Sequence, residues 1–126
     1  MCWGGASLQI GNNSGMSNTS IICTNSISIG DNVKIGAGCL LMDSNFHSLD
    51  YETRRNSSLD GKNAVSSPII IEDDVFIGTR CLILKGVTIG ARSIIAGGSV
   101  VVHSIPSDCI AGGNPCVIIK MNINRE

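Results

Sequence analysis

The sequence contains very few aromatic residues. Only 3% of its 126 residues are Phe, Trp or Tyr, although 43% are hydrophobic. Large rings usually fill much of a globular core, so this shortage favours a narrow interior filled by Ile, Val, Leu and small residues. The chain also has three prolines against 15 glycines, which indicates many tight turns.

Several other features are absent, and each absence excludes a class of protein. The net charge is −1, so no basic field points to nucleic acid. No apolar run approaches the roughly 20 residues that a membrane span requires. The first residues lack the basic start and apolar stretch of a signal peptide, so we expect a cytoplasmic protein.

The cysteines show no CxxC spacing. The six stand at positions 2, 23, 39, 81, 109 and 116, which favours buried free thiols over metal ligands or disulfides. The length suits a single domain that spans residues 1–126.

The positive signal is an aliphatic residue at every sixth position. Isoleucine or valine occupies positions 71, 77, 83, 89, 95 and 101 without exception. The fifth place of each six holds a small or medium residue, namely Val75, Cys81, Val87, Ser93 and Ser99. Upstream, Ile29, Ile35 and Leu41 follow the same pattern, and Ile10 begins a looser first turn.

A period of six fits neither the 3.6-residue period of a helix nor the two-residue period of a simple strand. It predicts a coil with three flat sides, each one hexapeptide long, so that 18 residues complete a turn. Parallel strands then stack coil on coil in an all-β solenoid. By this counting, the chain forms roughly five to six coils.

The repeat is interrupted at about residues 42–68 by a polar, non-periodic segment. A loop of about 25 residues is far longer than usual, and such loops tend to be functional. It contains His47, one of two histidines, and the adjacent pair Arg54 and Arg55. We interpret the segment as an active-site arm; the alternative is a solvated insertion with an incidental histidine.

Five segments carry a family resemblance that covers about residues 8 to 120, namely 43–47, 71–79, 86–90, 95–99 and 111–116. In these segments the chain resembles the hexapeptide-repeat acyltransferases. It is most similar to the sugar O-acetyltransferases, including galactoside and maltose acetyltransferases, of the type associated with capsule and lipopolysaccharide synthesis. The resemblance implies a left-handed parallel β-helix and a homotrimer with active sites between neighbouring solenoids. The left hand comes from the resemblance alone, because parallel crossovers are normally right-handed.

The resemblance also implies acetyl-CoA as the acyl donor, a sugar hydroxyl as the acceptor, and no required metal. An alcohol attacks only when its proton is removed, and a histidine suits that task at neutral pH. We therefore expect His47 to act as general base in a direct ternary complex. Asp43 is our candidate to orient the imidazole, with a backbone carbonyl as the alternative.

Alignment with the family places Ser17 and Asn18 where related enzymes hold the acceptor, and it also gives the CoA candidates. The other acceptor candidates lie in the long loop, namely Asn45 and the pair Arg54 and Arg55, whose charge suits an anionic or hydroxylated acceptor. The CoA candidates are Thr79, Gly97, Val102, His103 and Lys120. Each has a plainer interpretation as well, because Ser17 and Asn18 suit a turn, and the arginines and His103 suit a solvent-facing surface.

The same fold also serves other functions, and the sequence argues against some of them more strongly than against others. A γ-class carbonic anhydrase needs three zinc-bound histidines, and the chain has two. A catalytically inactive trimeric scaffold or a truncated transferase subunit is the main alternative. Transfer to an amino group or to serine, or from an acyl-carrier protein, would keep the fold and change the partner.

Overall fold

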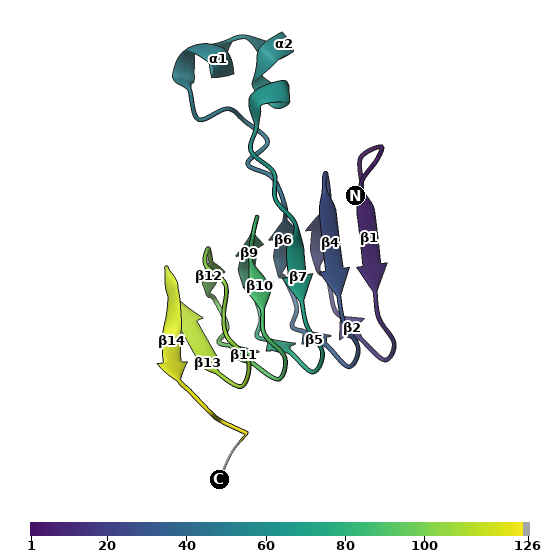
Figure 1. Cartoon of the computed structure of the whole chain (residues 1–126), viewed down its shortest axis with the longest axis vertical. Helices are drawn as coiled ribbons and strands as arrows, with labels where there is room; N and C mark the ends of the chain where they lie inside the picture. The colour runs from purple at the N-terminus through teal and green to yellow at the C-terminus, as the bar shows by residue number, and fades with distance from the viewer. Residues whose placement is uncertain (125–126) are drawn as a thin grey trace.

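The chain forms a three-sided coil, described for residues 1–124 by the computed structural model (Figure 1). Each side is a sheet of short, mainly parallel strands. The first sheet contains β1 (Ser7–Ile10), β4 (Ser26–Ile29), β7 (Ile69–Ile71) and β10 (Thr88–Ile89). The second contains β2 (Gly15–Met16), β5 (Lys34–Ile35), β8 (Phe76–Ile77), β11 (Ile94–Ile95), β13 (Ile110–Gly113) and β14 (Cys116–Lys120). The third contains β3 (Ser20–Ile22), β6 (Leu40–Met42), β9 (Leu82–Leu84) and β12 (Val100–Val101).

Strands β1 to β12 visit the three sheets in turn and make four complete coils, and β13 and β14 add part of a fifth on the second sheet. The predicted period holds between the third and fourth coils, where Ile71 pairs with Ile89, 18 positions further on. The spacing differs between the first and second coils, where Ile10 pairs with Ile29, and between the fourth and fifth, where Ile94 pairs with Ile110. The prediction of five to six coils was too high, since an arm between the second and third coils uses part of the chain.

The repeat positions fill the interior as predicted. The aliphatic column is almost inaccessible to solvent: Ile71, Ile77, Ile83, Ile89, Ile95 and Val101 are each 1% exposed or less. The fifth places are equally buried, at 1% or less for Val75, Cys81, Val87, Ser93 and Ser99. Short side chains suffice because each coil encloses only a narrow interior.

Serine and cysteine at the fifth place also bridge adjacent coils. The Ser93 hydroxyl donates to the Pro106 carbonyl and accepts from the Cys109 N–H at 3.1 Å. The Cys39 thiol donates to the Gly78 carbonyl at 3.1 Å and accepts from the Cys81 N–H at 3.4 Å. A hydroxyl or thiol can do both, so these residues satisfy corner backbone groups that would otherwise be buried without partners.

Five of the six thiols are buried, which confirms that prediction, and only Cys2 is exposed. Burial, with a smaller contribution from the nearby Asp43 charge, raises the pKa of Cys23 to about 11. Because the thiolate is the reactive form, we expect iodoacetamide at pH 8 to label one thiol per native chain and all six in guanidinium. Rapid labelling of several native thiols, counted by mass spectrometry, would contradict the buried core.

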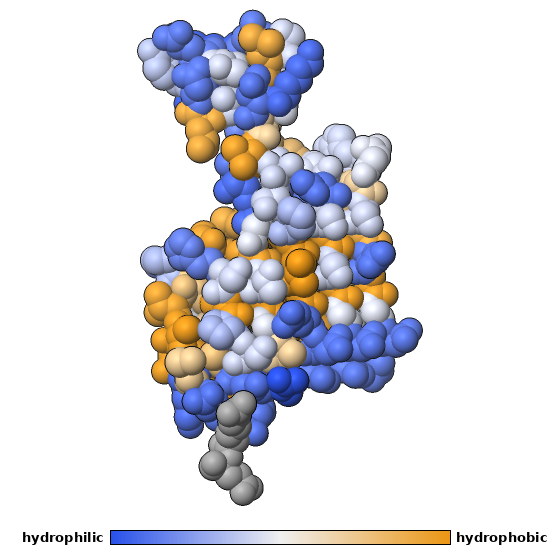
Figure 2. All heavy atoms as spheres, in the orientation of Figure 1, coloured by the Kyte–Doolittle hydropathy of each residue, from blue (hydrophilic) through white to orange (hydrophobic). Residues whose placement is uncertain are grey.

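The interruption forms an arm, residues 43–68, which projects from the edge where the third sheet meets the first (Figure 1). It carries α1 (Tyr51–Arg55), α2 (Ser57–Asp60) and a 3₁₀ turn at Gly61–Asn63, none of which was predicted. The strands on either side stay in register across it, because β4 pairs with β7. Figure 2 shows mainly hydrophilic residues over the arm. Within residues 1–124, no helix is long and apolar enough to cross a membrane.

Candidate active site

The arm is fixed to the body at its base. The Asp43 carboxylate is fully buried and accepts hydrogen bonds from the Thr24 N–H at 2.8 Å, the Thr24 hydroxyl at 3.0 Å and the Asn25 N–H at 2.8 Å. The Asp43 carbonyl accepts from the Ser67 N–H, just before β7, at 3.0 Å. Asp43 therefore ties both ends of the arm to the preceding coil.

His47 forms a carboxylate pair within the arm. Its Nδ1 lies 2.6 Å from Oδ2 of Asp60, whose other oxygen accepts from the Ser48 N–H at 2.6 Å. These two bonds lower the pKa of Asp60, because both favour the ionised carboxylate. An ionised Asp60 places the proton on Nδ1 and leaves Nε2 able to accept one. The stabilisation that this pair gives the folded chain is fully present above the ordinary pKa of a carboxyl group. It is lost as the pH falls through the lowered pKa of Asp60, where the carboxylate takes up a proton. The His47 side chain is 68% exposed, so substrate can reach it.

The prediction that Asp43 orients His47 was therefore wrong. The Asp43 carboxylate is occupied by backbone and hydroxyl donors of the preceding coil, whereas Asp60 binds the imidazole. Asp60 lies 13 positions after His47, a spacing without significance until the intervening helices are known. The sequence did contain one signal for these helices, namely two residues that favour helix N-termini. The Asp50 and Asn56 side chains each cap a helix, and the two helices together fold the arm back on itself.

The three acceptor candidates in the arm have structural contacts there. Arg54 donates to the Ser48 carbonyl at 3.0 Å, next to His47. The Arg55 guanidinium lies 5.2 Å above the centre of the Tyr51 ring, and the Asn45 N–H donates to the Val65 carbonyl across the base of the arm. Arg54 is thus the one of the three that supports the segment holding the imidazole.

Ser17 and Asn18 lie elsewhere, in the turn between β2 and β3. This turn belongs to the edge where the second and third sheets meet, which we call the small-residue edge. Asn18 adopts a φ of 46°, and its carbonyl accepts from the Gly38 N–H of the next coil. Within one chain the structure places these two residues on a different edge from the arm.

Thr79 and Gly97 are neighbours on the small-residue edge. The Gly98 N–H donates to the Thr79 carbonyl at 2.8 Å. A Cβ at Gly97 would lie 3.3 Å from the Thr79 carbonyl oxygen and 3.5 Å from its hydroxyl. Together they leave a stretch of exposed backbone without bulky side chains, which a slender ligand can approach closely.

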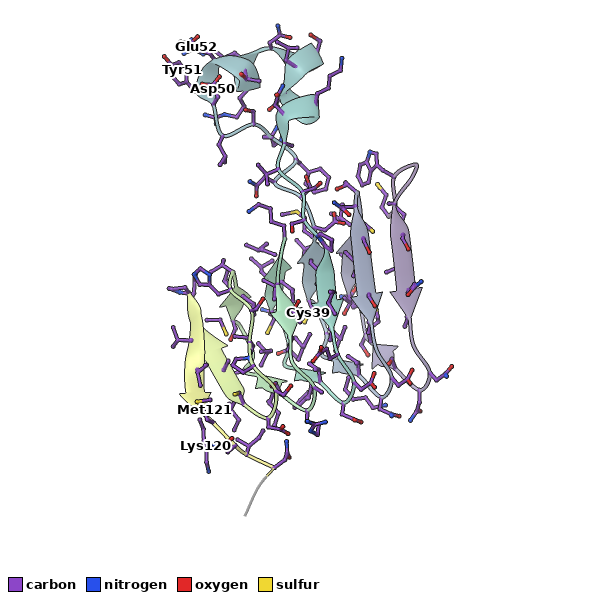
Figure 3. The ribbon with its side chains drawn as sticks, in the orientation of Figure 1. Cys39, Asp50, Tyr51, Glu52, Lys120 and Met121 are labelled. Carbon is purple, nitrogen blue, oxygen red and sulfur yellow. The ribbon has the colours of Figure 1, made fainter. Side chains whose placement is uncertain are left out.

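The other CoA candidates lie apart from that pair. Val102 and His103 follow β12, at the edge from which the arm also projects. Lys120 ends β14 and lies at the opposite end of the view from the arm (Figure 3). All five CoA candidates are exposed, but in one chain they occupy three separate places. Sequence alignment could not reveal this separation.

Comparison with known proteins establishes the family. The profile for the hexapeptide repeat of succinyl-transferase matches residues 9–42 and 68–102, more than half of the chain. Galactoside O-acetyltransferase of Escherichia coli K12 is 36% identical over 123 residues, which cover 97% of this chain and 58% of that protein. The chain therefore belongs to the hexapeptide-repeat acyltransferases, and a galactoside O-acetyltransferase is among the relatives that it resembles over nearly its whole length.

Solved structures agree. A hexapeptide-repeat acetyltransferase from Vibrio cholerae, in complex with acetyl coenzyme A, is 39% identical with a TM-score of 0.84, covering 95% of this chain and 63% of that one. A galactoside acetyltransferase in complex with coenzyme A is 29% identical with a TM-score of 0.75, covering 91% and 64%. These likenesses confirm the predicted left-handed parallel β-helix with one inserted loop. The chain spans about three fifths of the length of these relatives.

Proposed function

We propose that this chain is an acetyl-CoA-dependent O-acetyltransferase that acts on a hydroxyl group of a sugar. The observation that carries the proposal is the exposed His47 imidazole held by Asp60 at 2.6 Å. A base of this kind suits an alcohol acceptor, which must lose its proton to attack. The names of the relatives support both the donor and the acceptor class.

The proposed reaction is a direct transfer. Asp60 holds the proton on Nδ1 of His47, and Nε2 takes the proton of the sugar hydroxyl as its oxygen attacks the thioester carbonyl. The tetrahedral intermediate then collapses, the carbon–sulfur bond breaks, and the leaving thiolate takes the proton from Nε2. An acyl-cysteine intermediate is disfavoured because five of the six thiols are buried, and burial raises the pKa of Cys23 and Cys81.

The proposed donor site follows the small-residue edge, where Thr79 and Gly97 leave room for the pantetheine chain. Val102, His103 and Lys120 are proposed to contact other parts of CoA. Because His47 and the pair Thr79–Gly97 lie on different edges of one chain, a homotrimer in which the arm of one subunit faces the small-residue edge of its neighbour would complete the site. Light scattering of the purified protein tests this assembly.

Gly97→Val is expected to weaken acetyl-CoA binding by at least about tenfold, equal to about 1.4 kcal/mol. The added methyl groups would occupy the space beside Thr79 that we assign to the pantetheine chain. Isothermal titration calorimetry measures the change. Gly15→Val is the matched control, because a Cβ there meets nothing within 4 Å. Unchanged affinity in folded Gly97→Val would remove the donor site from this edge.

The activity is tested by release of free CoA thiol from acetyl-CoA with a panel of sugars and sugar nucleotides. Acceptor-dependent release supports the transferase. If no acceptor causes release and calorimetry detects no binding of acetyl-CoA, the results favour the alternative. That alternative is an inactive trimeric scaffold or a truncated transferase subunit.

A further inference from the structure

A pocket of about 410 Å³ lies at the foot of the arm, on the side that faces the N-terminal segment. Figure 2 shows the surface hollowed beneath the arm there. The lining comes from separate parts of the chain: Trp3 and Thr24 from the body, and Ser44, Phe46, Gly61, Lys62, Ala64 and Ser66 from the arm. Two lining residues are chain neighbours of the imidazole pair, because Phe46 directly precedes His47 and Gly61 directly follows Asp60, although neither His47 nor Asp60 lines the pocket itself.

We propose that this pocket holds the acceptor as a sugar ring that carries an anionic substituent, with Lys62 as the residue that selects for the charge. This inference rests on the proposed function in one respect, because only that function makes the bound sugar the acceptor of the acetyl group. The binding itself is independent of acetyl transfer.

The aromatic residues support a sugar ring as the occupant. Trp3 and Phe46 lie with their ring centroids 5.5 Å apart and their planes tilted by 50°. Trp3 remains 46% exposed as a residue. The chain has four aromatic residues, and two of them line this pocket rather than the core. Open ring faces offer an apolar surface to the C–H face of a sugar, in the manner typical of small-molecule sites.

The polar lining suits hydroxyl groups. The Thr24 hydroxyl donates to Asp43 and keeps its lone pairs, whereas the Ser44 hydroxyl accepts from the Phe46 N–H and keeps its proton. The Ser66 hydroxyl accepts from the Asn25 amide at 3.4 Å and can still donate. The pocket therefore presents both donors and acceptors, as a polyol requires.

Lys62 is the only charged residue in the lining. Over residues 1–124, no carboxylate lies within ion-pair distance of its ammonium group. The two carboxylates nearest in the sequence to the lining are both engaged, Asp43 with Thr24 and Asn25, and Asp60 with His47 and Ser48. Lys62 can thus pair with a ligand carboxylate or phosphate at the mouth of the pocket.

The test uses Trp3, the only tryptophan in the chain, as a fluorescent reporter. Glucose, glucuronate and glucose 6-phosphate are titrated without acetyl-CoA, so the result does not depend on turnover. We expect glucuronate or glucose 6-phosphate to bind about fivefold more tightly than glucose, the upper end of what an exposed ion pair contributes. The two charged sugars distinguish a carboxylate from a phosphate, and added salt should reduce the preference.

Lys62→Met should remove the preference and leave glucose binding unchanged. Lys34→Met is the matched control, because Lys34 lies on β5 outside the pocket and should retain the preference. The proposal is overturned if no sugar changes Trp3 fluorescence, if wild type binds all three sugars equally, or if Lys62→Met still prefers the charged ones. Charge-selective binding without acetyl transfer would uphold the pocket and count against the transferase.

Discussion

His47→Ala is expected to lower acceptor-dependent release of CoA by about 10²- to 10⁴-fold, the usual contribution of a general base. The loss should fall on turnover rather than on acetyl-CoA affinity, because the imidazole acts on the acceptor hydroxyl. Its side chain is 68% exposed, so the substitution should leave the fold intact. The measurement is the initial rate of thiol release at saturating acetyl-CoA, with circular dichroism of each variant as a check on folding.

Two carboxylate variants separate orientation from anchoring. Asp60→Asn should also slow turnover, because an amide can donate to Nδ1 and so place the imidazole proton on Nε2, where a base cannot use it. Asp43→Asn should mainly lower the melting temperature, because this carboxylate accepts two backbone N–H groups and a hydroxyl at the base of the arm. A His47→Ala enzyme with the wild-type rate would exclude the proposed base, and an Asp60→Asn enzyme with that rate would exclude the proposed orienting residue.

Ile83→Ala is expected to destabilise the protein by about 2–5 kcal/mol, the usual cost of truncating a buried isoleucine. Ile83 is completely buried in β9, and its column is continuous from coil to coil, so neighbouring coils cannot easily close the cavity. Urea unfolding at one fixed protein concentration gives the free energy of unfolding.

Leu82 provides the matched control, since it precedes Ile83 on the same strand but is 37% exposed. Leu82→Ala should cost much less than Ile83→Ala in the isolated chain. Equal losses from the two substitutions would contradict the alternation of inward and outward side chains on β9.

The fold could be predicted because the repeat itself carries the structure. An inward aliphatic residue at every sixth position requires one flat side per hexapeptide, and the columns of Ile71, Ile77 and Ile83 lie where that period places them. The number of coils was less accessible, because the offsets between coils vary. The pairing of Ile10 with Ile29 spans 19 positions and that of Ile94 with Ile110 spans 16, and the third and fourth coils alone follow the ideal spacing closely.

The site was less predictable than the fold, because it depends on a segment without periodicity. His47 could be identified as a candidate base from its chemistry and its place in a long polar loop. Asp60 could not, since the contact at 2.6 Å arises only after two short helices reverse the chain. The aromatic pair of Trp3 and Phe46 was equally hidden, because it joins the first residues of the chain to the arm.

The uninterrupted register across the arm suggests how such proteins could diversify. Because β4 and β7 pair as if residues 43–68 were absent, the arm can change in length or sequence without disturbing the coils. It brings the proposed base, the carboxylate that orients it and most of the pocket lining. The edge that we assign to the acyl donor belongs to the coils instead. Recognition of a new acceptor could therefore evolve, or be engineered by exchanging one arm for another, while the donor site stays as it is.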